Sequence, residues 1–282
     1  MSNSAAADTV ERLAAALRGR PLPRVRALHL PPTPWTGTKD GEFCALELDD
    51  GSLGVSYVLL EDTLAGLAAR HPHGDALAGD DPMAWARCWA DASAPPLRRT
   101  IGYAAVNALT RHLHDRAGYV PPTAPDSIGG LDPRPGETIG MVGYFPPLVR
   151  QVTARGARLV VVELRADLAG AHDGFRVTLD PAALRECSAV LMTSTVLLND
   201  TLDVLLAFCR GARAVAMVGP GASCLPDALF ERGVSCLAGV WIEHGAAFVQ
   251  ALRDGAPWGT HVRKVAIRRD ATGAAQPGAA AS

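Results

Sequence analysis

The first half of the chain shows the hydrophobic pattern of a small α+β unit. Two apolar runs of strand length, 43–48 and 53–59, flank an Asp-Gly turn. A turn of this kind between two apolar runs predicts a β-hairpin. The remaining elements expected here are a strand at 25–30 and helices at 5–17, 61–70, 80–91 and 98–116. Strands and helices in separate runs are typical of an α+β domain.

In the second half, strand and helix patterns alternate. The apolar run 139–142 ends at Gly143, and the two prolines at 146–147 suit the first turn of a helix, where the backbone N–H is unpaired anyway. The β-branched run 159–162 then has the composition of a buried parallel strand. The alternation continues at 189–192, 200–209, 214–218, 226–232, 234–237 and 246–253. This pattern predicts an α/β fold with a Rossmann-like parallel sheet.

Composition indicates where the domains begin and end. Residues 121–137, between the two patterns, are rich in proline and glycine, as linkers are. Residues 271–282 are small and polar, a composition that favours disorder. We therefore predict an α+β cap domain over 1–120, a linker over 121–137, an α/β domain over 138–270 and a disordered tail over 271–282.

Polar or glycine-rich residues directly follow the apolar strands of the second half. Ligands of open parallel sheets bind beyond the carboxyl ends of the strands, so we expect these residues to form one site. We expect the cleft between the two domains to hold it, because two walls exclude water better than one. The predicted ligand-binding residues are Gly143, Tyr144, Phe145, Glu163, Thr193, Ser194, Thr195, Asn199, Asp200, Gly219, Pro220 and Ser223, with Asn107 from the cap.

Glu163 is the residue that bears on a cofactor. It follows Gly143 at an offset of 20 residues, where an acid in dinucleotide-binding units meets the ribose hydroxyls. The glycine fingerprint itself is incomplete, because Tyr144 and Phe145 stand where a pyrophosphate needs bare backbone. This disfavours a diphosphate cofactor and leaves S-adenosylmethionine less affected. The alternative interpretation, that Glu163 only caps the strand end, stays open.

Simpler structural roles are open for other candidates as well. Asn199 could serve only as the N-cap of the helix expected from Asp200. The segment 219–221, Gly-Pro-Gly, could be no more than a tight turn.

Charge and hydropathy narrow the range of partners. Hydrophobic residues make up 48% of the chain and charged residues 20%, enough for a sizeable core. The formal net charge of −2 provides no field that attracts nucleic acid or anionic lipid. The sequence contains no apolar run of about 18 residues, the length that a membrane span needs. Residues 1–20 also lack the apolar core of a secretory signal. We therefore expect a cytoplasmic protein that binds neither nucleic acid nor membrane.

Metal-ligand spacing is not visible in the sequence. The six cysteines include no C-x-x-C pair, so we expect reduced and mostly buried thiols. His112 and His114 stand two apart on an expected helix and point to different faces. Cys224 is the only cysteine expected near the strand ends, and its more economical interpretation is a small apolar filler.

The residues of the second half resemble the heavy-metal chelation family. The similarity is best at 139–145, 161–163, 193–202 and 218–220, and it is looser at 102–109. Members of that family join a domain similar to the enolase N-terminal domain to a Rossmann-like domain, so the resemblance implies both folds. The chain departs from the family where it has Asp200 in place of an expected glycine, and at Cys224.

Two functional hypotheses follow. In the first, implied by the resemblance, the chain binds a small molecule or a metal complex in the interdomain cleft, with a divalent metal as the associated ion. In the second it is an enzyme of specialised metabolism that uses a nucleoside cofactor, S-adenosylmethionine before NAD. A cleft without function is a third possibility. The sequence assigns no catalytic residue and leaves the oligomeric state open, a homo-oligomer included.

Overall fold

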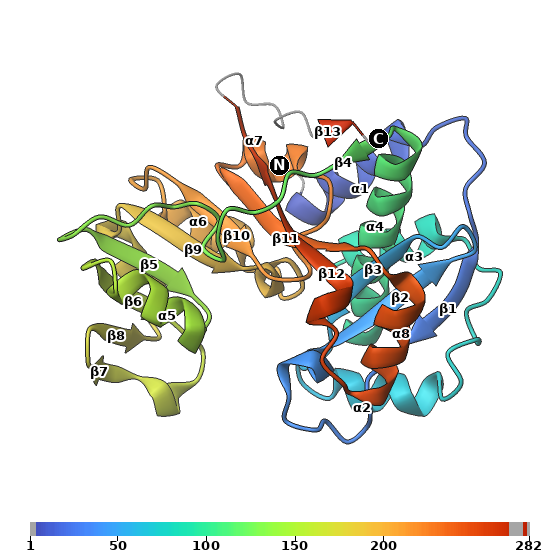
Figure 1. Cartoon of the computed structure of the whole chain (residues 1–282), viewed down its shortest axis with the longest axis horizontal. Helices are drawn as coiled ribbons and strands as arrows, with labels where there is room; N and C mark the ends of the chain where they lie inside the picture. The colour runs from blue at the N-terminus through green and yellow to red at the C-terminus, as the bar shows by residue number, and fades with distance from the viewer. Residues whose placement is uncertain (1–3, 271–278, 281–282) are drawn as a thin grey trace.

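The structure, a computed structural model, describes residues 4–270 and 279–280. The tail predicted to be disordered falls largely outside these residues, at 271–278 and 281–282. The first half forms a three-stranded antiparallel sheet and four helices (Figure 1), which together are called the cap below. Its elements are α1 (Ala5–Ala16), β1 (Val25–His29), β2 (Phe43–Leu48), β3 (Leu53–Tyr57), α2 (Thr63–Arg70), α3 (Pro82–Ala90) and α4 (Pro96–Arg116).

The long helix α4 organises the cap because small residues let its neighbours approach closely. A Cβ atom at Gly54 of β3 would lie 2.1 Å from the backbone nitrogen of Ala108, so only glycine fits there. A Cβ atom at Gly102 of α4 would lie 2.5 Å from the carbonyl oxygen of Trp85 on α3. Glycines at two contact points thus explain the tight packing of this helix.

The second half forms an eight-stranded sheet in the order β12-β11-β10-β9-β5-β6-β8-β7. The six inner strands are parallel, whereas the edge strands β7 and β12 run antiparallel to their neighbours. When the six parallel strands are numbered along the chain, their order across the sheet is 3-2-1-4-5-6, which is the Rossmann order. The strands are β5 (Thr138–Val142), β6 (Arg158–Val162), β7 (Gly170–His172), β8 (Phe175–Thr178), β9 (Ala189–Thr193), β10 (Val215–Val218), β11 (Cys236–Ile242) and β12 (Val262–Arg268).

Helices and short 3-10 turns connect these strands. The α-helices are α5 (Pro146–Thr153), α6 (Leu202–Phe208), α7 (Asp227–Glu231) and α8 (Gly245–Asp254). The 3-10 turns are η1 (Lys39–Glu42) in the cap, then η2 (Ala166–Leu168), η3 (Pro181–Glu186), η4 (Ser194–Leu197) and η5 (Gly259–His261). Two short strands, β4 (Tyr119–Val120) and β13 (Ala279–Ala280), pair antiparallel beside the cap.

The predicted mixed α/β architecture is confirmed, with differences in detail. Sequence reasoning did not identify β7, β8 and β12, and it ended β11 at residue 237, five residues early. β7 and β12 are edge strands, and β12 carries charged residues at 263, 264 and 268 that obscure its apolar pattern. These edges widen the sheet without changing its central strand order.

Both faces of the large sheet are buried, by different parts of the chain. On one face, sheet residues such as Met192 and Met217 share a single apolar core with Leu13 and Trp89 of the cap. On the other, α5 and the segment 121–137 form the cover, with Ile128 fully buried in it. The backbone of this segment also pairs with β12, since the Ala124 N–H donates to Lys264 O at 3.0 Å. The two halves are therefore joined by a common core as well as by the chain.

No helix within the described ranges is both long enough and apolar enough to cross a membrane.

Candidate functional site

The carboxyl ends of the central strands meet where the strand order reverses. β5 lies between β6 and β9, so the strands that follow β5 in the chain are added first on one side of it and then on the other. Gly143 follows β5 with a φ angle of +87°, which favours glycine. A Cβ atom placed there would lie 3.3 Å from Thr193 Cγ2 and from Phe145 Cε2. The loop after β5 is thus in contact with the end of β9.

Glu163 joins the loop after β5 to the loop after β6. Its Oε2 accepts a hydrogen bond from the Tyr144 N–H at 2.9 Å. Its Oε1 accepts from the N–H groups of Leu164 at 2.7 Å and Arg165 at 3.3 Å. These bonds are the ones expected of a residue that caps strand ends. These three bonds use three of the roughly four lone-pair sites of the carboxylate, so a ribose hydroxyl would find one left, on Oε2.

The loops after β9 and β10 also touch. The Thr193 hydroxyl accepts from the Thr195 N–H at 3.2 Å and bonds the Thr195 hydroxyl at 3.1 Å. Ser194 is buried, and a Cβ atom at Gly219 would lie 3.0 Å from its Oγ. Contacts therefore run without a break from the loop after β6 to the loop after β10. The residues in this strand-end cluster are Gly143, Tyr144, Phe145, Glu163, Thr193, Ser194, Thr195 and Gly219.

Asn199 and Asp200 lie beyond this cluster on the exposed side of η4. α6 begins at Leu202, so Asn199 is not the helix cap that the sequence suggested. Its Oδ1 instead accepts from the Thr201 hydroxyl at 2.7 Å, in a local turn. Asp200 has a φ angle of +56° and forms a bidentate ion pair with Arg99 of α4 at 2.6 Å. Asp200 therefore ties this loop to α4 of the cap.

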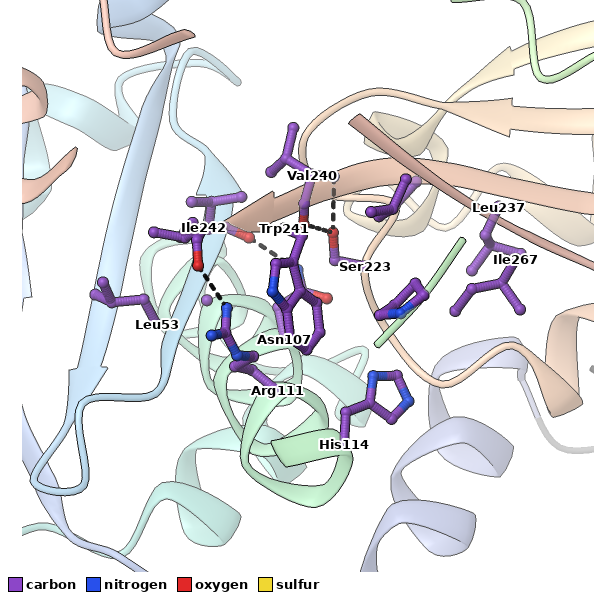
Figure 2. A pocket seen from close by; sticks show the side chains of 15 residues that line it. Leu53, Asn107, Arg111, His114, Ser223, Leu237, Val240, Trp241, Ile242 and Ile267 are labelled. Carbon is purple, nitrogen blue, oxygen red and sulfur yellow. Dashed lines mark hydrogen bonds between the residues drawn. The ribbon is translucent and has the colours of Figure 1, made fainter. Parts of the chain in front are cut away.

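A pocket lies between α4 of the cap and β11–β12 of the large sheet (Figure 2). The space unfilled by protein is about 490 Å³, part of it open to solvent. Two predicted residues line it, Asn107 and Ser223, whereas Pro220 lies just behind and accepts a bond from the Ser223 hydroxyl at 3.1 Å. This space, called the α4 pocket below, is further lined by Leu53, Gly54, Val55, Arg111, His114, Pro121, Ala222, Leu237, Val240, Trp241, Ile242, Val265 and Ile267.

The strand-end cluster and the α4 pocket are neighbours separated by the loop after β10. The carbonyl oxygen of Gly221 in this loop accepts from the Tyr103 hydroxyl at 2.5 Å and from Asn107 Nδ2 at 3.3 Å. On the other side of the loop, a Cβ atom at Gly221 would lie 3.1 Å from Ser194 Oγ. The predicted residues thus fall into two adjacent places.

Sequence reasoning missed the residues of α4 other than Asn107. Tyr103, Arg111 and His114 follow the spacing that puts side chains on one face of a helix. That spacing was visible in the sequence. Trp241 was not accessible in the same way, because its strand was expected to end earlier.

Burial and one neighbouring charge set the electrostatics of the α4 pocket. Burial, together with the Arg111 charge, lowers the pKa of His114 to about 4, so its ring is neutral at pH 7. The Arg111 guanidinium lies 3.8 Å from the centre of the Trp241 ring. It also donates to Asp115 Oδ2 at 2.7 Å and to Ile242 O at 2.7 Å, so its charge is largely compensated.

The cap also faces the strand-end cluster, and Tyr57 at the end of β3 shows this. Burial raises the pKa of Tyr57 to about 12, and the nearby charges of Glu42 and Glu163 add to the shift. Burial likewise raises the pKa of Glu42. A carboxylate of the cap and one of the sheet therefore act on the same phenol from opposite sides of the domain boundary.

The metal-ligating side chains do not fit a bare heavy-metal ion. In the part of the chain that the structure describes, no group of three or more His, Cys, Asp or Glu side chains could hold one. The residues outside that part contain none of these four types. Burial also raises the pKa of the Cys44 and Cys224 thiols to about 12, which disfavours the thiolate that binds metals.

Two solved structures have a similar fold over nearly the whole chain. A protein of unknown function from the DUF364 family of Desulfitobacterium hafniense is 20% identical, with a TM-score of 0.64 over 93% of this chain and 98% of that one. A DUF364 protein of Pyrococcus horikoshii is 18% identical, with a TM-score of 0.68 over 94% and 99%. At these identities the likeness establishes the fold.

Sequence comparison identifies the family. An uncharacterized protein of Methanocaldococcus jannaschii is 29% identical over 146 residues, which is 50% of this chain and 54% of the relative. The chain thus matches about half the length of that curated relative. The DUF4213 family, described as "Putative heavy-metal chelation", matches residues 41–110. DUF364, with the same description, matches residues 127–269, more than half of the chain. The chain belongs to this heavy-metal chelation family.

Proposed function

We propose that the chain binds a small molecule or a metal complex at the strand-end cluster, in the cleft beneath the cap. The observation that carries this proposal is the unbroken series of contacts from Glu163 through Gly143 and Thr193 to Gly219. These loops stand at the point where the strand order reverses, which is where open α/β sheets bind ligands. Their half-buried hydroxyl and backbone groups are suited to orienting a polar ligand.

The ligand class follows from the donor set. The protein offers no cluster of its own side chains for a bare ion in the described residues. A metal handled here would therefore arrive with an organic ligand that already occupies most of its coordination positions. Glycines, hydroxyls and backbone N–H groups would recognise that organic ligand, and the metal would not need protein thiolates.

Thermal unfolding of the metal-stripped protein tests the proposal. Divalent metals alone and the same metals complexed by small organic chelators are added in parallel series. We expect stabilisation by at least one complex and little by the bare ions, because a ligand of the native state adds about 2.7 kcal/mol at 100 times its Kd. Absence of stabilisation by every complex would contradict the proposal.

A matched pair of variants localises the effect. Thr193→Val removes a hydroxyl of the strand-end cluster while keeping the shape of the side chain. Thr153→Val does the same on α5, where the hydroxyl only bonds its own helix at Val149 O. Stabilisation should fall in the first variant and remain in the second. Equal responses in both would place the ligand elsewhere.

One observation favours the second hypothesis, an enzyme with a nucleoside cofactor. The strand order is that of dinucleotide-binding sheets. Glu163 directly follows β6, at the position of the ribose-binding acid in such sheets. S-adenosylmethionine and NAD therefore belong in the same thermal series. Stabilisation by S-adenosylmethionine that Glu163→Gln abolishes would support this hypothesis over the first.

A further inference from the structure

The amide of Asn107 presents an unpaired acceptor to the α4 pocket. Its Nδ2 donates to Val55 O at 2.8 Å and to Gly221 O at 3.3 Å. Both partners are carbonyl oxygens, so the nitrogen must face them and Oδ1 must point the other way. Asn107 is only 2% exposed, and Oδ1 has no hydrogen-bond partner among the described residues. Figure 2 shows this oxygen directed into the space beside Trp241.

A buried acceptor without a donor is rare in folded proteins, because it has lost its water without replacement. The amide cannot rotate to repair this, since a rotated group would set its oxygen against two carbonyl oxygens. Ser223 does not supply the donor either. Its hydroxyl lies 3.1 Å from both Pro220 O and Val240 O, and it accepts from the Val240 N–H at 3.3 Å. No donor among the described residues meets this oxygen, so a bound molecule would have to supply it.

The walls of the pocket restrict the rest of such a ligand. Most of the lining is aliphatic, and the Trp241 ring adds an aromatic surface. A cation is disfavoured because the mostly aliphatic lining would remove its water without supplying a counter-charge. An anion is disfavoured because Asn107 Oδ1 repels negative charge, and because Arg111 is already paired with Asp115. A neutral molecule remains.

We propose that the α4 pocket is a second binding site, separate from the strand-end cluster, for a small neutral molecule that joins an apolar or aromatic body to one N–H or O–H donor. The donor bonds Asn107 Oδ1, and the body lies among Trp241, Ile267 and Leu237. This assignment gives Asn107 a role different from that of the strand-end residues.

Two small aromatic probes, one with and one without a donor, test the assignment on the native chain. Phenol carries an O–H group, whereas anisole has a methyl ether in its place. Titration calorimetry or ligand-observed NMR should show that phenol binds at least about tenfold more tightly than anisole. Bound anisole would leave Asn107 Oδ1 without a hydrogen bond, and the free energy of that loss corresponds to such a ratio of Kd values. Equal affinities, or no binding of either, would overturn the proposal.

Variants and a crystal soak complete the test. Asn107→Leu keeps the volume but removes the acceptor, so the preference for phenol should disappear, whereas Thr153→Val on α5 should retain it. If Asn107→Leu does not fold, a phenol-soaked crystal of the native chain decides. Phenol oxygen within hydrogen-bond distance of Asn107 Oδ1 supports the site, and an ordered water there without phenol refutes it. Neither probe contains a metal, so the result is independent of the strand-end proposal.

Discussion

At the scale of residues, the candidate sites are built from side chains that the backbone holds in place. Glu163 is bonded by three N–H groups of two loops, and Asn107 by two carbonyl oxygens of two different halves. Sequence reasoning could select both residues, because each has a polar side chain in an apolar context. It could not separate a ligand contact from a cap, because that depends on which backbone groups are close in space.

His114 makes the stability of the chain depend on pH. Its folded pKa, about 4, lies below the ordinary histidine value of 6.5 because of burial and the Arg111 charge. Between these pH values the imidazole binds a proton in the unfolded chain but not in the folded chain. The free energy of unfolding therefore decreases as the pH falls from 6.5 to 4. His114→Phe keeps a ring against Tyr119 and removes the proton, so it should recover about 1–2 kcal/mol at pH 4.5 relative to pH 7.5.

Urea unfolding at the two pH values measures this effect. His73→Phe, in an exposed loop, is the matched control and should leave the pH dependence as in the parent. The groups against His114 are Arg111 on its own helix, Tyr119 after it and Trp241 on β11, and Asp115 is paired with Arg111. An unchanged pH profile in His114→Phe would show that this ring does not carry the effect.

At the scale of elements, the strongly periodic segments were predictable and the weakly periodic ones were not. α4 and the hairpin β2–β3 lie within a few residues of their expected limits, because their apolar patterns are long or are marked by a turn. β8 has only four residues, and β12 mixes charged with apolar ones. For such strands, pairing with a neighbour decides the structure, and pairing is not encoded locally.

In the loop before α6, Asp200 stands where the sequence resemblance led us to expect glycine. The φ angle of +56° there suits glycine best and tolerates Asp or Asn. Asp200 uses the position to pair with Arg99, whose side chain is 12% exposed. Asp200→Asn should keep the turn but leave this guanidinium without its carboxylate, at a cost of about 1–2 kcal/mol.

The control for this change is Asp167→Asn, which breaks a fully exposed pair with Arg165 and should cost close to nothing. Denaturant midpoints of both variants provide the comparison. If the two variants lose the same small amount, the Arg99 pair does not hold α4 against the sheet.

At the scale of the whole molecule, the convergence of strand-end loops followed from the sequence, because parallel strands end at one edge. The α4 pocket did not follow, since it depends on how the cap docks against β11 and β12. No sequence signal reports the angle between two halves. The domain limits predicted around 121–137 remain a prediction, and the shared core shows that the halves are energetically joined.

The shared core predicts one cooperative unfolding transition. Ile128→Ala removes a fully buried side chain from the cover of the sheet and should cost about 2–5 kcal/mol. Tryptophan fluorescence, to which both halves contribute, and far-UV circular dichroism should still report the same midpoint. Leu164→Ala, at a side chain that is 78% exposed, is the control and should change little. A second transition, or a shift in only one signal, would show that the halves unfold separately.

The docking of α1 on α7 has a consequence for synthesis on the ribosome. Asp8 and Arg12 of the first helix pair with Arg232 and Glu231. Arg232 is translated 224 residues after Asp8, which at cellular elongation rates is roughly 10–45 s later. The first helix can pack on α3 and α4 as soon as the cap has been made, but its ion pairs with α7 and Arg232 form only when most of the chain has emerged.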